Sequence, residues 1–246
     1  MAAFSFVLVF SWLVLSPWGW MIGAQSTPPA RFDGFVYEID GQLPPGSCSV
    51  DSTITIEAFF DPVCPDSRDA WPPLKQALSY YAPRVSLFVH PFPLPYHDNA
   101  FATSRALHIV NKMNSSATYS LLELFFKRQK GLYNKPTFNM SRASITSQIV
   151  QMATEALGDS CDYAVGDSCQ SVITSGFTDK ESDMLTRVSF KYGCSRGVFG
   201  TPFFFVNGFA LPDAGAAIDY GKWRSIIDPL IKERSRDRKE GLHYLL

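Results

Sequence analysis

Apolar and polar residues follow one another along this chain in blocks that predict a definite order of strands and helices. Residues 53–60 are rich in β-branched and aromatic side chains and apolar on both faces, which is typical of a strand buried within a sheet. A helical periodicity follows over residues 67–81. A second strand is predicted at 85–90, where prolines end it. Residues 98–192 then carry the periodicity of several successive helices.

Local signals predict where these helices begin, bend and end. Pro72 and Pro73 lie inside the first helix and predict a bend in it. Ser141 stands where it can cap the start of a later helix. Gly131 and Gly193 are expected to end two others, because glycine adopts the backbone conformation that closes a helix.

Strand patterns return in the last part of the chain. Residues 202–206 and 209–211 flank Asn207-Gly208, the preferred pair for a type I′ turn, and so predict a hairpin. A final helix is expected over 216–234, and Phe35-Val36-Tyr37 can form a short edge strand. The order strand, helix, strand, several helices, hairpin, helix predicts an α/β fold, a mixed sheet with a helical block inserted midway.

The two ends of the chain differ in character from this central region. Phe4 to Leu15 is an almost unbroken apolar run, and small residues follow near Ala24. Residues 1–24 therefore predict a secretory signal peptide, with an uncleaved membrane anchor as the alternative. The Pro- and Gly-containing residues 25–52 predict an extended arm, and residues 235–246 a charged tail.

Composition narrows the class of protein. The chain has 246 residues, a net charge of −1, 46% hydrophobic and 18% charged residues, so a large core is available. The balanced charge does not favour a nucleic-acid partner or an anionic membrane surface. No stretch after the signal segment has the length of a membrane-spanning helix.

Two sequence features agree with a secretory route. Asn114-Ser115-Ser116 and Asn139-Met140-Ser141 are N-glycosylation sequons, which predict modification at Asn114 and Asn139. The chain also has five cysteines, an odd number, so at least one thiol is left without a partner in the same chain. We expect the protein to be secreted or held in the lumen of the endomembrane system.

Most of the cysteines suggest structural roles. Cys161 and Cys169 lie close together in a predicted loop and are expected to form a disulfide. Cys48 and Cys194 are a second candidate pair, and a bond between Cys48 and Cys64 is an alternative, because spacing does not determine connectivity. The cysteines lack the close-paired spacing of zinc ligands, so no metal site is predicted.

Cys64 stands in a different setting, between the strand that ends at Phe60 and the predicted helix. A thiol at a helix N-terminus is favoured as thiolate by the amide groups and the helix dipole. Arg68 adds to this effect, while Asp61, Asp66 and Asp69 oppose it. Thiol–disulfide enzymes use this arrangement with a second cysteine three residues later, and here that position is Ser67.

Three motifs of this chain resemble those of one protein family and occur in the same order along the sequence. Phe60-Asp61-Pro62-Val63-Cys64-Pro65 is similar to the active-site segment of DsbA-like thioredoxin-fold proteins. The stretch 90–97 resembles the family's link into its helical insertion, and 197–208 its loop and hairpin. The likeness covers residues 53–234, with the insertion at about 98–192.

The resemblance implies a fold and a set of site residues. The fold is a thioredoxin-like mixed sheet with an inserted helical subdomain. Cys64 would be the nucleophile, and Pro202, preceded by Thr201, would be a cis-proline facing it. Together with Pro65 and Asp66, these two residues would form the substrate-binding surface. There an extended client can add to the backbone edge.

Two departures from the family pattern bear on mechanism. The usual Cys-x-x-Cys is here Cys64-Pro65-Asp66-Ser67. The family's buried acid aligns with Ala58, whereas Glu57 comes one residue early and should point to the opposite face of the strand. A proton relay through Glu57 is therefore not expected.

The single thiol defines which chemistry is available. Without a second sulfur at Ser67, the site cannot resolve its own mixed disulfide, which argues against net oxidation of clients. Cys64 can still isomerise or hold client proteins that carry cysteines or disulfides. No cofactor is expected, and glutathione can serve as a co-substrate. Glutathione-dependent transferase or isomerase chemistry is one alternative. A non-catalytic binding module with a degenerate site is the other, so the pattern leaves open whether the protein is an enzyme.

Overall fold

The computed structural model describes residues 34–37, 54–158, 168–213 and 215–243. The chain divides into two units, Met1–Arg31 and Phe32–Leu246, and every described residue belongs to the second. The expected signal peptide at residues 1–24, most of the arm at 25–52, Cys48 and Cys161 lie outside the described residues.

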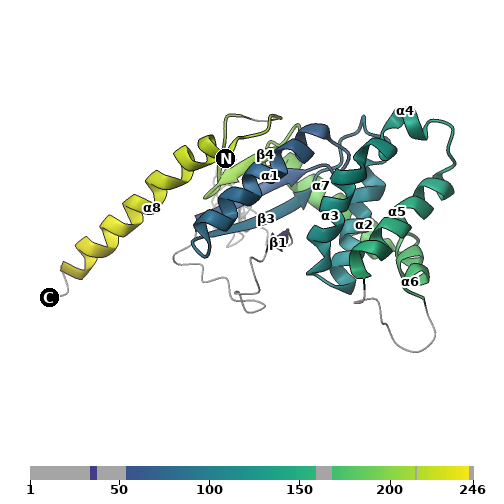
Figure 1. The fold of residues 1–246 in the computed structure, drawn as a ribbon, viewed down its shortest axis with the longest axis horizontal. Helices are drawn as coiled ribbons and strands as arrows, with labels where there is room; N and C mark the ends of the chain where they lie inside the picture. The colour runs from purple at the N-terminus through teal and green to yellow at the C-terminus, as the bar shows by residue number, and fades with distance from the viewer. Residues whose placement is uncertain (1–33, 38–53, 159–167, 214, 244–246) are drawn as a thin grey trace, which may run out of the picture. The chain divides into compact units, whose positions relative to one another are not determined.

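A mixed sheet forms the centre of the described fold (Figure 1). Its strand order is β1-β3-β2-β4-β5. The strands are β1 (Phe35–Tyr37), β2 (Ile54–Phe60), β3 (Val85–Pro91), β4 (Phe203–Val206) and β5 (Phe209–Ala210). β2 pairs parallel with β3, and the β1–β3, β2–β4 and β4–β5 pairs are antiparallel. The expected edge strand is confirmed as β1, and the expected hairpin as β4–β5.

The hairpin turn shows why the local signal was reliable. Asn207 and Gly208 have φ of 48° and 84°, the left-handed values that a type I′ turn requires at both positions. Asn207 also ties the turn to the central strand, since its side-chain oxygen accepts a hydrogen bond from the Thr55 amide at 3.0 Å. The turn therefore sets β4 beside β2.

Helices cover both faces of the sheet. α1 (Pro65–Tyr81) and α8 (Tyr220–His243) lie on one face, where Phe60 packs against Trp71 and Phe204 against Trp223. α7 (Lys180–Ser195) lies on the other, where Tyr192 packs against Phe59. Successive residues of a strand point to opposite faces of the sheet. The neighbouring residues Phe59 and Phe60 therefore pack against α7 and α1, respectively.

The inserted helices gather at one end of the sheet (Figure 1). They are α2 (Ala100–Met113), α3 (Ala117–Arg128), the 3₁₀ turn η1 (Gln129–Leu132), α4 (Asn134–Thr137), α5 (Arg142–Leu157) and α6 (Cys169–Gly176). The sequence indicated the insertion but assigned no helix to the segment that forms α6. Ser141 caps α5 as predicted, since its side chain accepts a hydrogen bond from the Ser144 amide at 3.1 Å.

Several predicted boundaries were wrong. α1 begins at Pro65 instead of residue 67 and continues through Pro72 and Pro73 to Tyr81. α8 begins at Tyr220 instead of residue 216, and its backbone continues to His243, so residues 235–243 extend the helix rather than form a separate tail.

Two glycines do not end helices as expected. α3 ends at Arg128 and passes into η1, which contains Gly131. Gly193 lies inside α7, and a Cβ there would stand only 2.5 Å from the Phe92 ring. A glycine is therefore needed at position 193 because α7 packs closely on the aromatic residues beneath it, and not because the helix ends there.

Candidate functional site

Cys64 caps the first helix of the fold. Its φ of −78° and ψ of 123° are extended, and Pro65 begins α1. Proline suits the first helical position, since its ring sets φ and no N–H is needed there. The Cys64 amide donates a hydrogen bond to the Asp61 carbonyl at 3.0 Å, which closes a tight turn between β2 and α1. The thiol therefore stands at the N-terminal, electropositive end of a 17-residue helix.

The segment before β4 faces this thiol. Cys64 Sγ donates a hydrogen bond to the Thr201 carbonyl oxygen at 3.3 Å, although 137 residues separate them in sequence. The Thr201–Pro202 peptide bond is cis, which confirms the bond geometry expected at this position. The structure thus brings Cys64, Thr201 and Pro202 together, as the three sequence motifs predicted.

Aromatic and aliphatic side chains enclose the sulfur. Only 3% of Cys64 is exposed, and it belongs to a compact cluster on the α7 side of the sheet. The other buried members are Phe59, Phe92, Leu94, Tyr192, Val198, Phe203 and Phe205. The thiol is therefore largely shielded from solvent in this structure.

Ser67 contacts the turn before Cys64 rather than Cys64 itself. It is fully buried in the first turn of α1, and its hydroxyl accepts a hydrogen bond from the Asp61 amide at 3.3 Å. Within the described part of the chain, no hydrogen bond joins Ser67 to Cys64. Pro65 is half-buried and Asp66 exposed at the mouth of the helix, so Asp66 is the more accessible of the two predicted binding residues.

Asp61 is a buried carboxylate paired with the partly buried His97, a contact that the sequence did not indicate. Its carboxylate is fully buried, accepts hydrogen bonds from the amides of Val63 at 2.8 Å and Leu94 at 3.2 Å, and lies 2.7 Å from His97 Nδ1. These contacts join the turn before Cys64 to the linker between β3 and α2. Asp61 thus has direct partners of its own, and its expected opposition to the Cys64 thiolate stays a prediction.

Gln129 is a second residue that sequence reasoning missed. It is 1% exposed in η1, and its side-chain amide donates hydrogen bonds to the carbonyls of Pro62 at 3.0 Å and Cys64 at 2.8 Å. Its own oxygen accepts a hydrogen bond from the Tyr133 hydroxyl at 2.7 Å. The helical insertion therefore holds the backbone of the thiol loop directly.

Two of the charged residues near the thiol pair with each other. Arg68 points to Asp69, with Nε 2.7 Å from the carboxylate, and the two form an exposed ion pair. The hydrogen bond between them raises the pKa of the Arg68 guanidinium and lowers the pKa of Asp69. The cation expected to favour the thiolate and one of the carboxylates expected to oppose it therefore lie side by side.

Glu57 points to the α7 side of the sheet, the face opposite that of Ala58, as its place in the strand predicted. The Tyr192 hydroxyl donates a hydrogen bond to its carboxylate at 2.6 Å, His90 Nε2 lies 3.6 Å away, and Arg196 lies 3.5 Å away. Burial raises the pKa of Glu57, but these three partners outweigh it and hold the pKa below its usual value. Among the described residues, the side-chain contacts of Glu57 are with Tyr192, His90 and Arg196 and not with Cys64.

Two exposed aromatic residues flank the thiol region. Phe199, in the loop before Thr201, is 76% exposed and packs edge-on against Phe203. Tyr96, in the linker after β3, is 61% exposed. Partial burial raises the pKa of Tyr96, and the charges of Cys64, Asp61 and Asp66 raise it further, so Tyr96 lies within electrostatic reach of the thiol.

The remaining cysteines give one correction. Cys194 is a free thiol, exposed in the last turn of α7, so the suggested pair with Cys48 is wrong. Cys169 at the start of α6 is disulfide-bonded. Its partner is neither Cys64 nor Cys194, because both are free. The pairing with Cys161 remains a prediction.

The two asparagines of the predicted glycosylation sequons differ in exposure. Asn114 is half-buried after α2, and its side-chain oxygen accepts hydrogen bonds from the amide and hydroxyl of Ser116, while Asn139 is exposed between α4 and α5. Among the described residues, no group of His, Cys, Asp and Glu side chains is arranged to hold a metal ion. The same residues include no helix with the length and apolarity needed to cross a membrane.

Comparison with known proteins identifies the fold. No protein-family model matches the chain, and no curated protein matches it by sequence. Among solved structures, it is similar to a proposed protein-disulfide isomerase from Pseudomonas syringae. That match has a TM-score of 0.59 at 17% identity and covers 71% of this chain and 93% of the other.

Two further structures share the architecture. Oxidised BdbD from Bacillus subtilis matches with a TM-score of 0.59 at 12% identity, covering 81% of this chain and 94% of that one. The thiol–disulfide exchange protein alpha-DsbA2 from Wolbachia pipientis matches with a TM-score of 0.57 at 13% identity, covering 81% and 88%. The chain therefore has a DsbA-like thioredoxin fold with a helical insertion.

Proposed function

We propose that this protein carries out thiol–disulfide exchange with client proteins through the single thiol of Cys64. The observation that carries the proposal is the position of Sγ, at the N-terminus of α1 and 3.3 Å from the Thr201 carbonyl. A helix N-terminus favours the thiolate, which is the reactive form in exchange. The Thr201 backbone beside it offers an edge to which an extended client segment can add.

The reaction proceeds in two balanced steps. The Cys64 thiolate attacks one sulfur of a client disulfide, so that a bond forms between Cys64 and the client while the second client sulfur leaves as a thiolate. Another thiolate of the same client then attacks the client sulfur of this mixed disulfide. That step forms a new client disulfide and returns Cys64 as a thiolate, so the client is isomerised without net oxidation.

Resolution depends on a thiol from outside the site. Ser67 offers only a hydroxyl, and that hydroxyl is buried against the Asp61 amide. A client held on Cys64 therefore stays bound until one of its own thiols, or glutathione as co-substrate, attacks. This favours isomerisation and client holding over oxidation, and it suits an oxidising secretory or extracytoplasmic compartment, for which the sequons at Asn114 and Asn139 also argue.

The test compares single-cysteine variants in a background that removes the competing thiol. Cys194 is exposed and would form unrelated mixed disulfides, so Cys194→Ser is introduced throughout. The protein with Cys64 intact is incubated with a scrambled disulfide-containing client, quenched by alkylation, and separated under non-reducing conditions. Mixed disulfides that vanish in Cys64→Ser and Cys64→Ala, together with recovery of native client activity, are expected. Equal yields with and without Cys64 would refute the proposal.

The burial of Cys64 supports a second candidate, a non-catalytic binding module. A thiol that is 3% exposed and covered by aromatic side chains is protected from solution reagents. Under this alternative, clients bind the Thr201 surface and Cys64→Ala leaves their affinity unchanged, while no covalent adduct forms. Glutathione-dependent transferase chemistry has less support, because neither Cys64 nor Ser67 lines the large cleft beside the insertion.

A further inference from the structure

A cleft of about 750 Å³ lies beside the thiol region, bounded by the β3–α2 linker, the α4–α5 segment and α7. Cavities of this size hold small organic ligands in other proteins. The linker contributes Pro93, Leu94, Pro95, His97, Asp98 and Asn99, and the helical segments contribute Phe101, Thr137, Phe138, Met140, Arg142, Ile145, Arg187, Phe190 and Lys191.

Much of the lining is apolar. Leu94 is buried, and Phe190 is held against Phe92 with ring centroids 4.8 Å apart, so this side of the cleft is a packed surface. Phe101 and Ile145 are half-buried, and Phe138 is 83% exposed. An aromatic side chain this exposed in the lining of a cleft can contact a bound apolar molecule.

The charges of the cleft have one predominant sign. Arg142, Arg187 and Lys191 contribute three cations, whereas Asp98 is the only acidic residue in the lining. Arg187 is engaged by Asp183 at 2.6 Å and lies over the Phe101 ring. Arg142 and Lys191 are exposed, and among the described residues neither takes part in an ion pair. Two cations thus remain available to a ligand beside an apolar surface.

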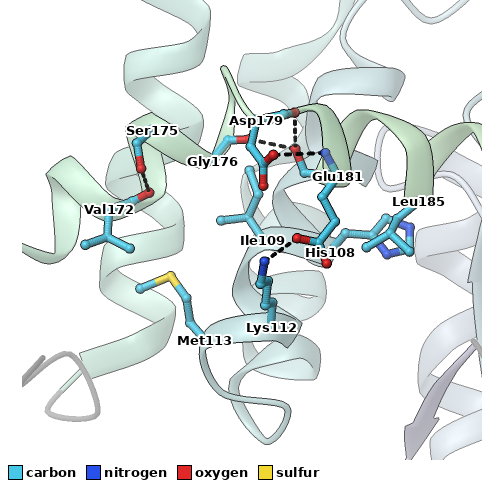
Figure 2. Close-up of a pocket in the computed structure, with 11 residues that line it drawn as sticks. His108, Ile109, Lys112, Met113, Val172, Ser175, Gly176, Asp179, Glu181 and Leu185 are labelled. Atoms are coloured by element: carbon cyan, nitrogen blue, oxygen red, sulfur yellow. Dashed lines mark hydrogen bonds and ion pairs between the residues drawn. The ribbon is translucent and has the colours of Figure 1, made fainter.

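Another cavity of about 400 Å³, between α2, α6 and α7, lacks this property (Figure 2). There Lys112 is paired with Glu181, and the Asp179 side chain accepts a hydrogen bond from the Glu181 amide (Figure 2). The Ser182 hydroxyl donates to the Gly176 carbonyl at 2.6 Å. These polar groups satisfy one another, so the cavity presents no comparable unpaired charge to a ligand.

We propose that the larger cleft binds a small amphipathic anion, an apolar body carrying one carboxylate or sulfonate. The apolar body would lie against Leu94, Phe101 and Phe190, and the acidic group would reach Arg142 and Lys191. Charge-assisted hydrogen bonds to these two side chains give the selectivity for an anion. The site is separate from the exchange chemistry, because Cys64 does not line it, and it stands whether or not Cys64 reacts.

Two fluorescent probes with the same aromatic skeleton test the proposal. 1-Anilinonaphthalene-8-sulfonate carries an acidic group, and N-phenyl-1-naphthylamine lacks it. The sulfonate is expected to bind the folded full chain, and Arg142→Glu/Lys191→Glu should weaken it by about tenfold while changing the neutral probe little. Ile145→Asp should weaken both probes, because it places a charge in the apolar part of the cleft.

A matched control separates the cleft from the general charge of the protein. Lys127→Glu/Lys130→Glu makes the same change in net charge at exposed residues outside the lining, and the sulfonate affinity should stay unchanged. Equal weakening in this control, no sulfonate binding to the wild type, or equal sulfonate affinity in the Arg142/Lys191 variant would each overturn the proposal. Displacement of the bound sulfonate by dodecanoate but not by dodecanol would extend the support to carboxylates.

Discussion

Asp61 Oδ2 lies 2.7 Å from His97 Nδ1, and this partly buried contact joins the turn that carries the thiol to the linker that enters the helical insertion. The carboxylate also accepts hydrogen bonds from the amides of Val63 and Leu94, so both of its oxygens are used. One side chain thereby fixes the positions of two loops on either side of the thiol. The stability of this arrangement can be measured.

Replacement of Asp61 by asparagine should destabilise the protein by about 2 to 3 kcal/mol, because an NH₂ group replaces one oxygen and then faces a donor. The same change should speed alkylation of buried Cys64 as the turn loosens. Urea unfolding and iodoacetamide kinetics in the Cys194→Ser background measure the two effects. Asp66→Asn is the matched control, because Asp66 is an exposed aspartate in the first turn of α1, close to Asp61 in sequence, and its replacement should change stability by less than about 0.5 kcal/mol. Equal unfolding of both variants would contradict this role.

Gln129 holds the backbone of the thiol loop at a second point, and substitutions there and at Tyr133 should lower stability by different amounts. Gln129→Met keeps the side-chain length but loses the hydrogen bonds to Pro62 and Cys64, at a cost of about 2 kcal/mol. Gln129→Glu should be worse at pH 7, because a carboxylate would face two carbonyl oxygens. Tyr133→Phe, which removes only the hydroxyl bonded to Gln129, should cost least. Unfolding free energies in any other order would argue against Gln129 as the anchor.

Glu57 predicts a dependence of stability on pH. Its folded-state pKa is held below the ordinary value of 4.5, so its partners stabilise the fold above that pH. The contribution is lost as pH falls through the folded-state pKa. Glu57→Gln should therefore cost about 2 kcal/mol at pH 7, and the difference from wild type should shrink below about pH 4.5.

Urea unfolding of both proteins at pH 7, 5, 4 and 3 measures that difference. Tyr192→Phe is an informative comparison, because it removes the hydrogen bond of 2.6 Å to Glu57 but leaves the carboxylate in place. This variant should lose part of the stabilisation and keep a weaker pH dependence. A wild-type advantage that is the same at all four pH values would show that the Glu57 charge does not stabilise the fold.

The features that the sequence predicted well depend on local patterns or on motifs of several adjacent residues. The type I′ turn at Asn207-Gly208, the cap at Ser141 and the position of Cys64 before a helix need only nearby residues. The contact of Cys64 with Thr201 spans 137 positions, and it was anticipated because both ends carry recognisable motifs.

The features that were missed depend on side chains that meet only after folding. Asp61 and His97 both lie in motifs, but neither motif indicates that the two side chains meet across 36 positions. Gln129, 65 positions from Cys64, lies in no motif. Gly193 resembles a helix end until the Phe92 ring is placed against it. In each case the residue type is compatible with several structural roles, and the tertiary packing determines which role it has.

Phe199 offers a test that concerns client contact and not the thiol itself. It is 76% exposed, two residues before Thr201, and a large exposed aromatic side chain next to a binding edge is typical of a contact site. Phe199→Ser should reduce the rate of mixed-disulfide formation on Cys64 severalfold while changing the free energy of unfolding little. Phe209→Ser is the matched control, since Phe209 is 79% exposed at the far end of the β4–β5 hairpin. If the two substitutions slow trapping equally, general surface hydrophobicity and not the Thr201 edge governs client capture.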